Sequence, residues 1–155
     1  MDKVDKRILE ILQNNSQISN QELAEMISLS PSPCLRRVRQ LEKDGYIKKN
    51  VAILDKALLN LNLTVFVLVV MKEHSTRSMD NFISVVEGIP HIIECHVITG
   101  QDADIMLKIV VPDMNYYNNF LFNNLLNIDS IENVISSFVL RSYEDKTSLP
   151  LDHIS

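Results

Sequence analysis

Apolar residues recur at helical spacing in the first third of the chain and predict three short helices. These helices are expected near residues 2–14, 20–28 and 31–44. Ser19 and Glu22 form a capping-box pattern before the second helix, in which each side chain satisfies a backbone N–H. The third helix is expected to begin at Ser30 and Pro31, which supply an N-cap hydroxyl and a proline at the first helical position. Two short capped helices joined by a tight turn predict a helix-turn-helix.

The third helix separates an apolar stripe from a polar, basic side at ~100° per residue. An isolated basic face is more often a solvated surface than a binding site. Behind a capped helix and a tight turn, we interpret it as a recognition helix for the DNA major groove. We expect the groove to be faced by Arg36, Gln40 and the small residues at the helix start. We expect the phosphates to be contacted by Arg37, Arg39 and Lys43. The predicted DNA-binding residues are Ser30, Ser32, Pro33, Arg36, Arg37, Arg39, Gln40 and Lys43.

The second half of the chain follows the order strand, helix, strand, strand, helix, strand. Strands are expected at residues 63–72, 91–99, 104–111 and 134–143, and helices at residues 76–87 and after Asp113. This order is that of a ferredoxin-like sheet with both helices on one face. The first strand is apolar almost throughout, which implies burial on both faces. A second copy of the sheet is the simplest cover for the other face, and it would make a symmetric dimer.

We therefore expect an α+β protein with two domains. Residues 1–60 would form a winged helix-turn-helix DNA-binding domain and a connecting strand, with short extended segments at residues 46–49 and 51–54 as the wing. Residues 61–155 would form a ferredoxin-like βαββαβ domain for effector binding and oligomerisation. Asn60, at the joint, tolerates a left-handed backbone better than other non-glycine residues.

Charge is distributed unevenly along the chain. Residues 1–50 hold nine Lys and Arg against seven Asp and Glu, whereas residues 51–155 hold six against thirteen. This acidic balance argues against DNA binding by the whole surface, but not by one basic helix. Cys34 and Cys95 lie in apolar patterns, which suits free thiols in a reducing cytosol. With no signal-peptide pattern and no apolar run long enough to span a bilayer, a cytoplasmic protein is expected.

Candidate catalytic and metal-binding groups are sparse. His91 and Cys95 share a strand face while His96 points the other way, which does not favour a zinc site. No nucleophile–base pair or phosphate-binding loop is present, so no enzymatic activity, cofactor or metal is expected. The loop at residues 99–104 could offer backbone N–H groups to a carboxylate and acidic side chains to an ammonium. A solvated turn is the alternative interpretation.

Several segments together identify a family resemblance. DKVDKRILEILQ, QISNQELAEMISLSPSPCLRRVRQLEKDGYI, IIECHVITG, DADIMLKIVVPDM and SSFVLRSYEDKTSLPL closely resemble the leucine-responsive/asparagine-regulator (Lrp/AsnC) family of transcription regulators. The resemblance implies a winged helix-turn-helix, a ferredoxin-like domain that dimerises and often assembles into octamers, and an amino acid bound between dimers. The implied effector-binding residues are Val97, Thr99, Gly100, Asp102, Asp104, Met114, Ser137, Phe138 and Val139.

The chain departs from the family pattern near that site. The Gly100–Asp104 loop is one residue longer, so either Asp102 or Asp104 could meet the effector's ammonium. Ile105 replaces an aromatic residue, and Asn50 and Asn60 stand where a tyrosine and a glycine are usual. The leading hypothesis is a regulator that binds double-stranded DNA, self-associates as a dimer, tetramer or octamer, and responds to an amino acid. The rivals are a ligand sensor acting on a protein partner and an enzyme subunit.

Overall fold

The computed structural model describes residues 1–100, 102–143 and 146–154, and its contacts divide the chain into two compact units. The first unit runs from Met1 to Ile53 and includes the C-terminal tail that begins at Tyr143. The second unit runs from Leu54 to Ser142. The sequence-based division had instead assigned the tail to the second domain.

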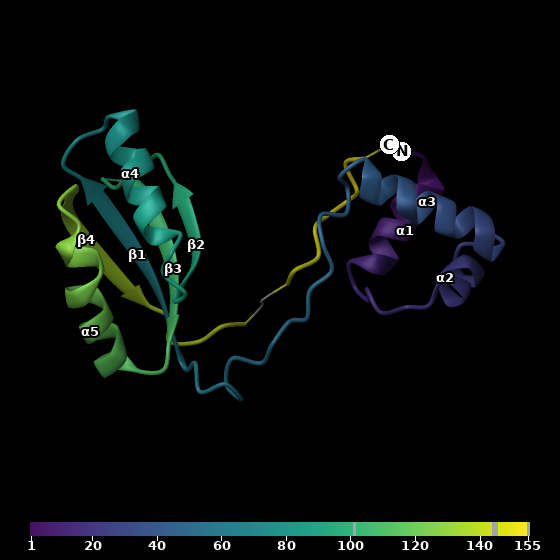
Figure 1. Cartoon of the computed structure of the whole chain (residues 1–155). Coiled ribbons are helices and arrows are strands. Elements are labelled where there is room, and N and C mark those ends of the chain that lie inside the picture. The colour runs from purple at the N-terminus through teal and green to yellow at the C-terminus, as the bar shows by residue number, and fades with distance from the viewer. Residues whose placement is uncertain (101, 144–145, 155) are drawn as a thin grey trace. The chain divides into compact units, whose positions relative to one another are not determined.

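The first unit is built from three helices. They are α1 (Lys3–Leu12), α2 (Asn20–Met26) and α3 (Pro31–Lys43) (Figure 1). One buried cluster joins them, made by Ile8, Ile11, Leu23, Ala24, Cys34 and Leu41. Because each helix buries one apolar stripe against the others, the three helices predicted from periodicity are confirmed, with slightly shorter ends.

Side-chain caps define where α1 and α2 begin. The Ser19 hydroxyl accepts a hydrogen bond from the Glu22 N–H, and the Glu22 carboxylate accepts one from the Ser19 N–H, which confirms the predicted capping box. An unpredicted second capping box joins Asp2 and Asp5 at the start of α1. Ser30 is the N-cap residue of α3, but its hydroxyl makes no capping hydrogen bond, contrary to prediction.

The predicted wing strands do not form. Residues 47–55 carry no strand or bridge, and Val51 and Ile53 are largely exposed. An extended segment needs a neighbouring strand to satisfy its N–H and C=O groups, and none of the described residues supplies one. Asn60 does adopt the expected left-handed backbone, with φ of 57°.

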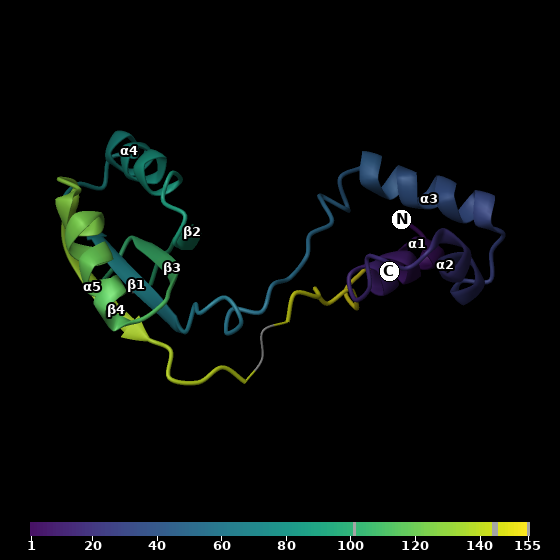
Figure 2. The ribbon, with the colours of Figure 1, turned by 60° about the horizontal axis from the view of Figure 1, so that its bottom comes forward.

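The second unit is a four-stranded antiparallel sheet with the order β2-β3-β1-β4. Its elements are β1 (Leu63–Met71), α4 (Thr76–Val86), β2 (Ile92–Val97), β3 (Ile105–Val111), α5 (Met114–Asn123), the short 3₁₀ helix η1 (Leu125–Asn127) and β4 (Ile131–Phe138). Both α4 and α5 lie on one face of the sheet, here called the covered face (Figures 1 and 2). The predicted ferredoxin-like α+β fold is therefore confirmed.

The last strand is shorter and earlier than predicted. It was expected at residues 134–143 but spans Ile131–Phe138. Its last pair places Phe138 opposite Val65, close to the point where β1 begins. One further backbone hydrogen bond joins the Val139 N–H to the Thr64 carbonyl at 3.0 Å, and Leu140 beyond it is 97% exposed.

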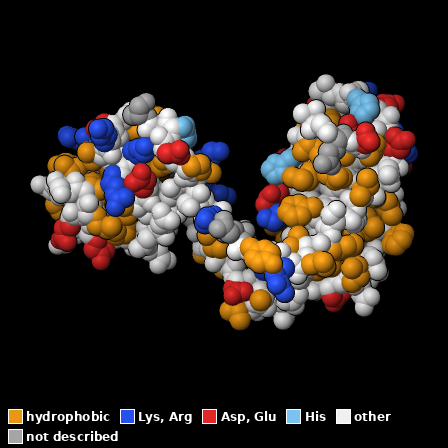
Figure 3. All heavy atoms as spheres, turned by 180° about the vertical axis from the view of Figure 1, so that it is seen from behind, with side chains coloured by type: hydrophobic (Ala, Val, Ile, Leu, Met, Phe, Trp, Pro, Cys, Tyr) orange, Lys and Arg blue, Asp and Glu red, His pale blue; other side chains and the backbone are white. Residues whose placement is uncertain are grey.

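The two faces of β1 differ in burial. Val65, Val67, Val69 and Met71 are fully buried against the helices, whereas the alternate residues are only partly buried. Burial on both faces is thus wrong for the isolated chain. The second face, here called the open face, carries apolar side chains around Leu68, which pairs with Met106 on one side and Ile135 on the other. Hydrophobic side chains gather on the back of this unit (Figure 3).

The C-terminal tail binds α1 within the first unit. Gln13 exchanges two hydrogen bonds with the backbone of Leu149, at 3.1 and 2.9 Å. The ammonium of Lys6 donates to the carbonyl of Ile154 at 3.0 Å. These contacts join residues more than 130 positions apart, so helical periodicity could not reveal them.

Candidate nucleic-acid interface and effector loop

The recognition-helix candidate α3 presents a basic surface with several unpaired side chains. Arg36, Arg39 and Lys43 are exposed and make no hydrogen bond or ion pair with any described residue. Ser30 and Ser32 at the helix start are also exposed, and Pro33 is half-buried. Guanidinium and ammonium groups that have no internal partner remain available for phosphates or guanine edges.

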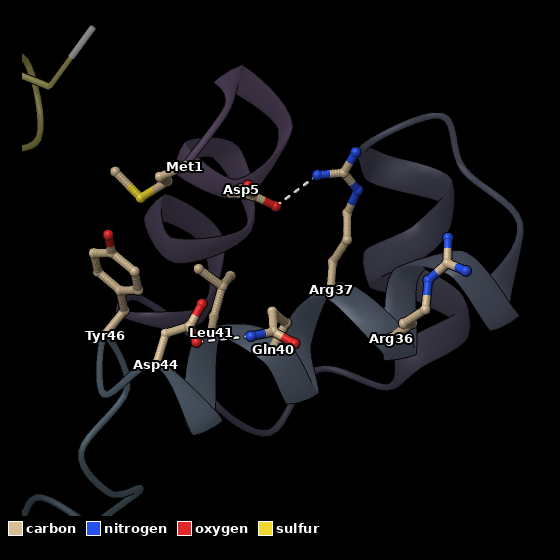
Figure 4. Close-up of a pocket in the computed structure, with 8 residues that line it drawn as sticks. All are labelled: Met1, Asp5, Arg36, Arg37, Gln40, Leu41, Asp44 and Tyr46. Atoms are coloured by element: carbon tan, nitrogen blue, oxygen red, sulfur yellow. Dashed lines mark hydrogen bonds and ion pairs between the residues drawn. The ribbon is translucent and has the colours of Figure 1, made fainter.

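Arg37 behaves differently from the other basic residues of α3. Its guanidinium donates to carboxylates of Asp2 and Asp5, both at 2.7 Å. Figure 4 shows the contact with Asp5. Asp5, and then Asp2, raise the pKa of Arg37. Hydrogen bonds from the Asp5 backbone, and then from Arg37, lower the pKa of the Asp2 carboxyl. Arg37 therefore ties α3 to the start of α1 in the free protein, rather than standing open to a phosphate as predicted.

A cavity of about 340 Å³ lies between α1 and α3. Gln40 lines it and donates to the Asp44 carboxylate at 2.7 Å, so its amide is engaged along the helix (Figure 4). This bond leaves the carbonyl oxygen of the Gln40 amide without a partner among the described residues. Arg36 also lines this cavity, and it has no partner among the residues drawn in Figure 4.

The two candidate carboxylates of the effector loop have different surroundings. Asp104 accepts a hydrogen bond from the Met71 N–H at 2.8 Å, and its other oxygen lies 2.9 Å from Nδ1 of His74. Its backbone is also paired, with Val69 and Ile98. Asp102 is exposed and its carboxylate has no partner among the described residues. Asp102 is therefore the carboxylate still available to a ligand.

The predicted effector residues divide between the two ends of the sheet. Val97, Thr99, Gly100, Asp102 and Asp104 lie where β2 ends and β3 begins. Met114, Ser137, Phe138 and Val139 lie toward the other end. Ile105 pairs with Val69 of β1, whereas Ser137 and Phe138 pair with Phe66 and Val65, about 10–13 Å away at ~3.3 Å per strand residue. The two groups are therefore separated along the sheet within one chain.

The residues at the far end also face different directions. Ser137 pairs with Phe66 and lies on the open face. Phe138 pairs with Val65 on the covered face, where its ring packs edge-on against Tyr117 at 5.4 Å. Because neighbouring strand residues point to opposite faces, only one of them can line a given pocket.

Of the three residues considered as metal ligands, His91 and His96 have partners within the chain. His91 contacts the Val110 carbonyl through Nδ1 and the Tyr116 hydroxyl through Nε2, beside a second cavity of about 370 Å³. Burial raises the pKa of both the Cys34 and Cys95 thiols, which disfavours the thiolate that binds metals. No metal-binding group of His, Cys, Asp and Glu occurs in the described part of the chain.

Three structural residues were missed by sequence reasoning. Asp2 and Asp5 carried a readable signal, because two acidic residues three apart before an apolar-periodic segment resemble a capping box. His74 carried none: it sits three residues after β1, and only the fold places it beside Asp104. None of the helices in the described residues is long and apolar enough to cross a membrane.

The geometry defines a class of protein: a helix-turn-helix unit with an exposed basic helix, followed in the chain by a ferredoxin-like unit. Comparison with known families agrees. Residues 1–48 match the model for winged helix-turn-helix DNA-binding domains, and residues 64–149 match that for the Lrp/AsnC ligand-binding domain. The chain belongs to the Lrp/AsnC family of transcriptional regulators, which confirms the resemblance seen in the sequence.

Individual relatives cover nearly the whole chain. The transcriptional regulator AzlB of Bacillus subtilis is 35% identical over 99% of this chain and 98% of its own length. The leucine-responsive regulatory protein of Escherichia coli is 35% identical over 96% and 90%. A transcriptional regulator of Neisseria meningitidis, solved in complex with L-methionine, is 37% identical with a TM-score of 0.95, covering 100% of this chain and 99% of that one.

Proposed function

We propose that the protein reads specific DNA sequences through α3 and adjusts its assembly and DNA affinity to an amino acid. The observation that carries the DNA-binding part is the set of exposed, unpaired cations on α3, behind a capped helix and a tight turn. Arg36 would contact base edges, and Arg39 and Lys43 would contact phosphates. Arg37 would act indirectly by fixing α3 against α1.

A binding assay with genomic DNA fragments tests this part. Wild-type protein is expected to bind a subset of fragments, with affinity that falls as salt rises. Arg36→Ala should lose about 1–3 kcal/mol on a specific site and relax base preference there. No binding to any fragment at low salt would rule out the proposal.

A second copy of the chain is the proposed partner for the open face. Phe66, Leu68, Met106 and Ile135 leave an apolar surface there that water would otherwise cover. A two-fold dimer would carry two recognition helices, which suits half-sites ~34 Å apart on one face of the duplex. Further assembly into tetramers or octamers would bring opposite sheet ends from different chains together.

The proposed effector is an amino acid bound at such a junction between copies. Asp102 would accept the ammonium, and backbone N–H groups of the Thr99–Gly100 turn would meet the carboxylate. Gly100 has φ of 101°, a conformation that residues with a Cβ rarely adopt. Met114 of a neighbouring chain, together with either Phe138 or Val139, would meet an apolar side chain. L-Methionine is the first ligand to test, because a relative 37% identical to this chain was solved with it.

A thermal-shift screen of the twenty amino acids tests the effector. At least one should raise the melting temperature of wild-type protein, and Asp102→Ala should abolish that rise. No shift with any amino acid at millimolar concentration would rule out an amino-acid effector. A shift that survives in Asp102→Ala would place the site elsewhere.

The rival functions make different predictions. A sensor acting only on a protein partner would show the ligand shift but no DNA binding. An enzyme subunit would turn over an amino acid in isolation, for which the site offers no nucleophile–base pair among the described residues. A cytoplasmic location remains a prediction of the proposed function.

A further inference from the structure

Asp104 and His74 meet at the end of the sheet that carries the effector loop. Oδ1 of Asp104 lies 2.9 Å from Nδ1 of His74. An ionised carboxylate can only accept hydrogen bonds, so the proton in this contact belongs to Nδ1. In the neutral imidazole, Nε2 is then an unprotonated acceptor.

This acceptor is available to a ligand. The His74 side chain is 73% exposed, and Nε2 has no partner among the described residues. The carboxylate that orients it is itself held, because Oδ2 of Asp104 accepts from the Met71 N–H and only 20% of the side chain is exposed. Asp104 thus acts as a fixed support that selects one tautomer of His74.

Asp102 lies close to this pair along the chain. It stands two residues before Asp104, so their Cα atoms are at most about 7 Å apart. Asp102 and His74 are both exposed, and Asp104 is partly exposed. The free carboxylate of Asp102 and the free imidazole nitrogen of His74 therefore lie at the same end of the sheet.

We propose that His74 is an effector-binding residue whose Nε2 accepts a hydrogen bond from the ammonium group that Asp102 neutralises. An ammonium has three N–H donors and needs more than one acceptor when it leaves water. Asp104 is a positioning residue that acts through His74. This assignment rests on the proposed amino-acid effector and divides the two carboxylates between two roles.

Two matched substitutions separate the ligand contact from simple support of the loop. His74→Asn puts an amide N–H near the position of Nδ1 and can keep the contact with Asp104, but it loses Nε2. His74→Gln puts its amide near the position of Nε2 and can offer an acceptor there. Binding of L-methionine to the full-length protein is measured by calorimetry, and unfolding without ligand confirms that each variant is folded.

His74→Asn is expected to weaken binding about tenfold, as for loss of one hydrogen bond to a charged group, and His74→Gln to recover part of that loss. If His74→Asn bound L-methionine with wild-type affinity, the proposed ligand contact would be overturned, because the hydrogen bond to Asp104 alone would then account for the role of His74. Equal losses in both variants would overturn it as well.

Ligand analogues test which end of the amino acid His74 meets. L-Methionine amide keeps the ammonium and lacks the carboxylate, so its affinity should fall in His74→Asn by the same factor as that of methionine. 4-(Methylthio)butanoate lacks the ammonium and should show no such factor. A loss confined to the butanoate would overturn the assignment to the ammonium. Failure of the wild type to bind any amino acid would instead reject the proposed effector itself, and this inference with it.

Discussion

The two units of this chain differ in how much of their function one copy contains. The first unit presents its recognition helix with unpaired cations already on the surface. The second unit keeps an apolar open face and places its candidate effector residues at opposite ends of the sheet. The candidate DNA-binding surface thus depends on one helix, whereas under the proposed function the second unit would need neighbouring copies to cover its open face and to complete its site.

The largest expected effect comes from placing a charge on the apolar open face. Leu68→Asp places a charge where the proposed dimer buries Leu68, Met106 and Ile135, and an unpaired buried charge is among the costliest changes. Light scattering should then report a mass near the monomer's 17.7 kDa. Val85→Asp is the matched control, because Val85 is already 48% exposed on α4 over the covered face. A Leu68→Asp protein with unchanged mass would refute a dimer through this face.

The next comparison lies within α3, between Arg39 and Arg37. Arg39→Ala should weaken binding to all DNA sequences and reduce the salt slope by about 1, as for one lost phosphate contact. Arg37→Ala should leave the salt slope unchanged, because its guanidinium is held by Asp2 and Asp5. Fluorescence anisotropy across a salt series measures both. Equal slope changes would show that Arg37 exchanges its carboxylates for a phosphate on binding DNA.

A smaller effect should come from the tail on α1. Gln13→Ala removes both hydrogen bonds to Leu149 and should lower the free energy of unfolding of the first unit by about 1 kcal/mol. Hydrogen exchange of α1 amides is the measurement, and amides of β1 in the second unit should not change. Exchange in α1 that matches the wild type would show that the tail contributes nothing to this unit.

The smallest expected effect is the loss of folding stability at low pH. The Ser19 hydroxyl, and then its N–H, lower the pKa of Glu22, and Lys108, and then His96, lower that of Glu94. A carboxyl with a lowered folded pKa adds stability above its unfolded pKa, and this is lost as pH falls through the folded value. The urea concentration at the midpoint of unfolding should stay nearly constant above about pH 5 and decrease below about pH 4. Glu22→Gln should reduce the decline for the first unit, and midpoints that rise toward pH 3 would contradict the assignment.

The sequence by itself determined the elements and their order. Helical periodicity, the Ser19–Glu22 capping box and the order of the four sheet strands depend on neighbours within a few residues, so they could be read directly and the structure agrees. The wing strands expected at residues 46–54 are the exception. The stripe of Cys34 and Leu41 likewise fixed which side of α3 is buried, and hence which side carries the free arginines.

Only the tertiary structure decided which charged groups are free. Arg37 and Arg39 look alike in sequence, but packing of α1 beside α3 brings two carboxylates to Arg37 alone. Asp102 and Asp104 also look alike, but the pairing of β1 with β3 sets Asp104 against Met71 and His74. The end of β4 followed from where β1 begins, not from its own apolar pattern. In each case the deciding partner is 30 or more residues away, beyond the reach of any local pattern.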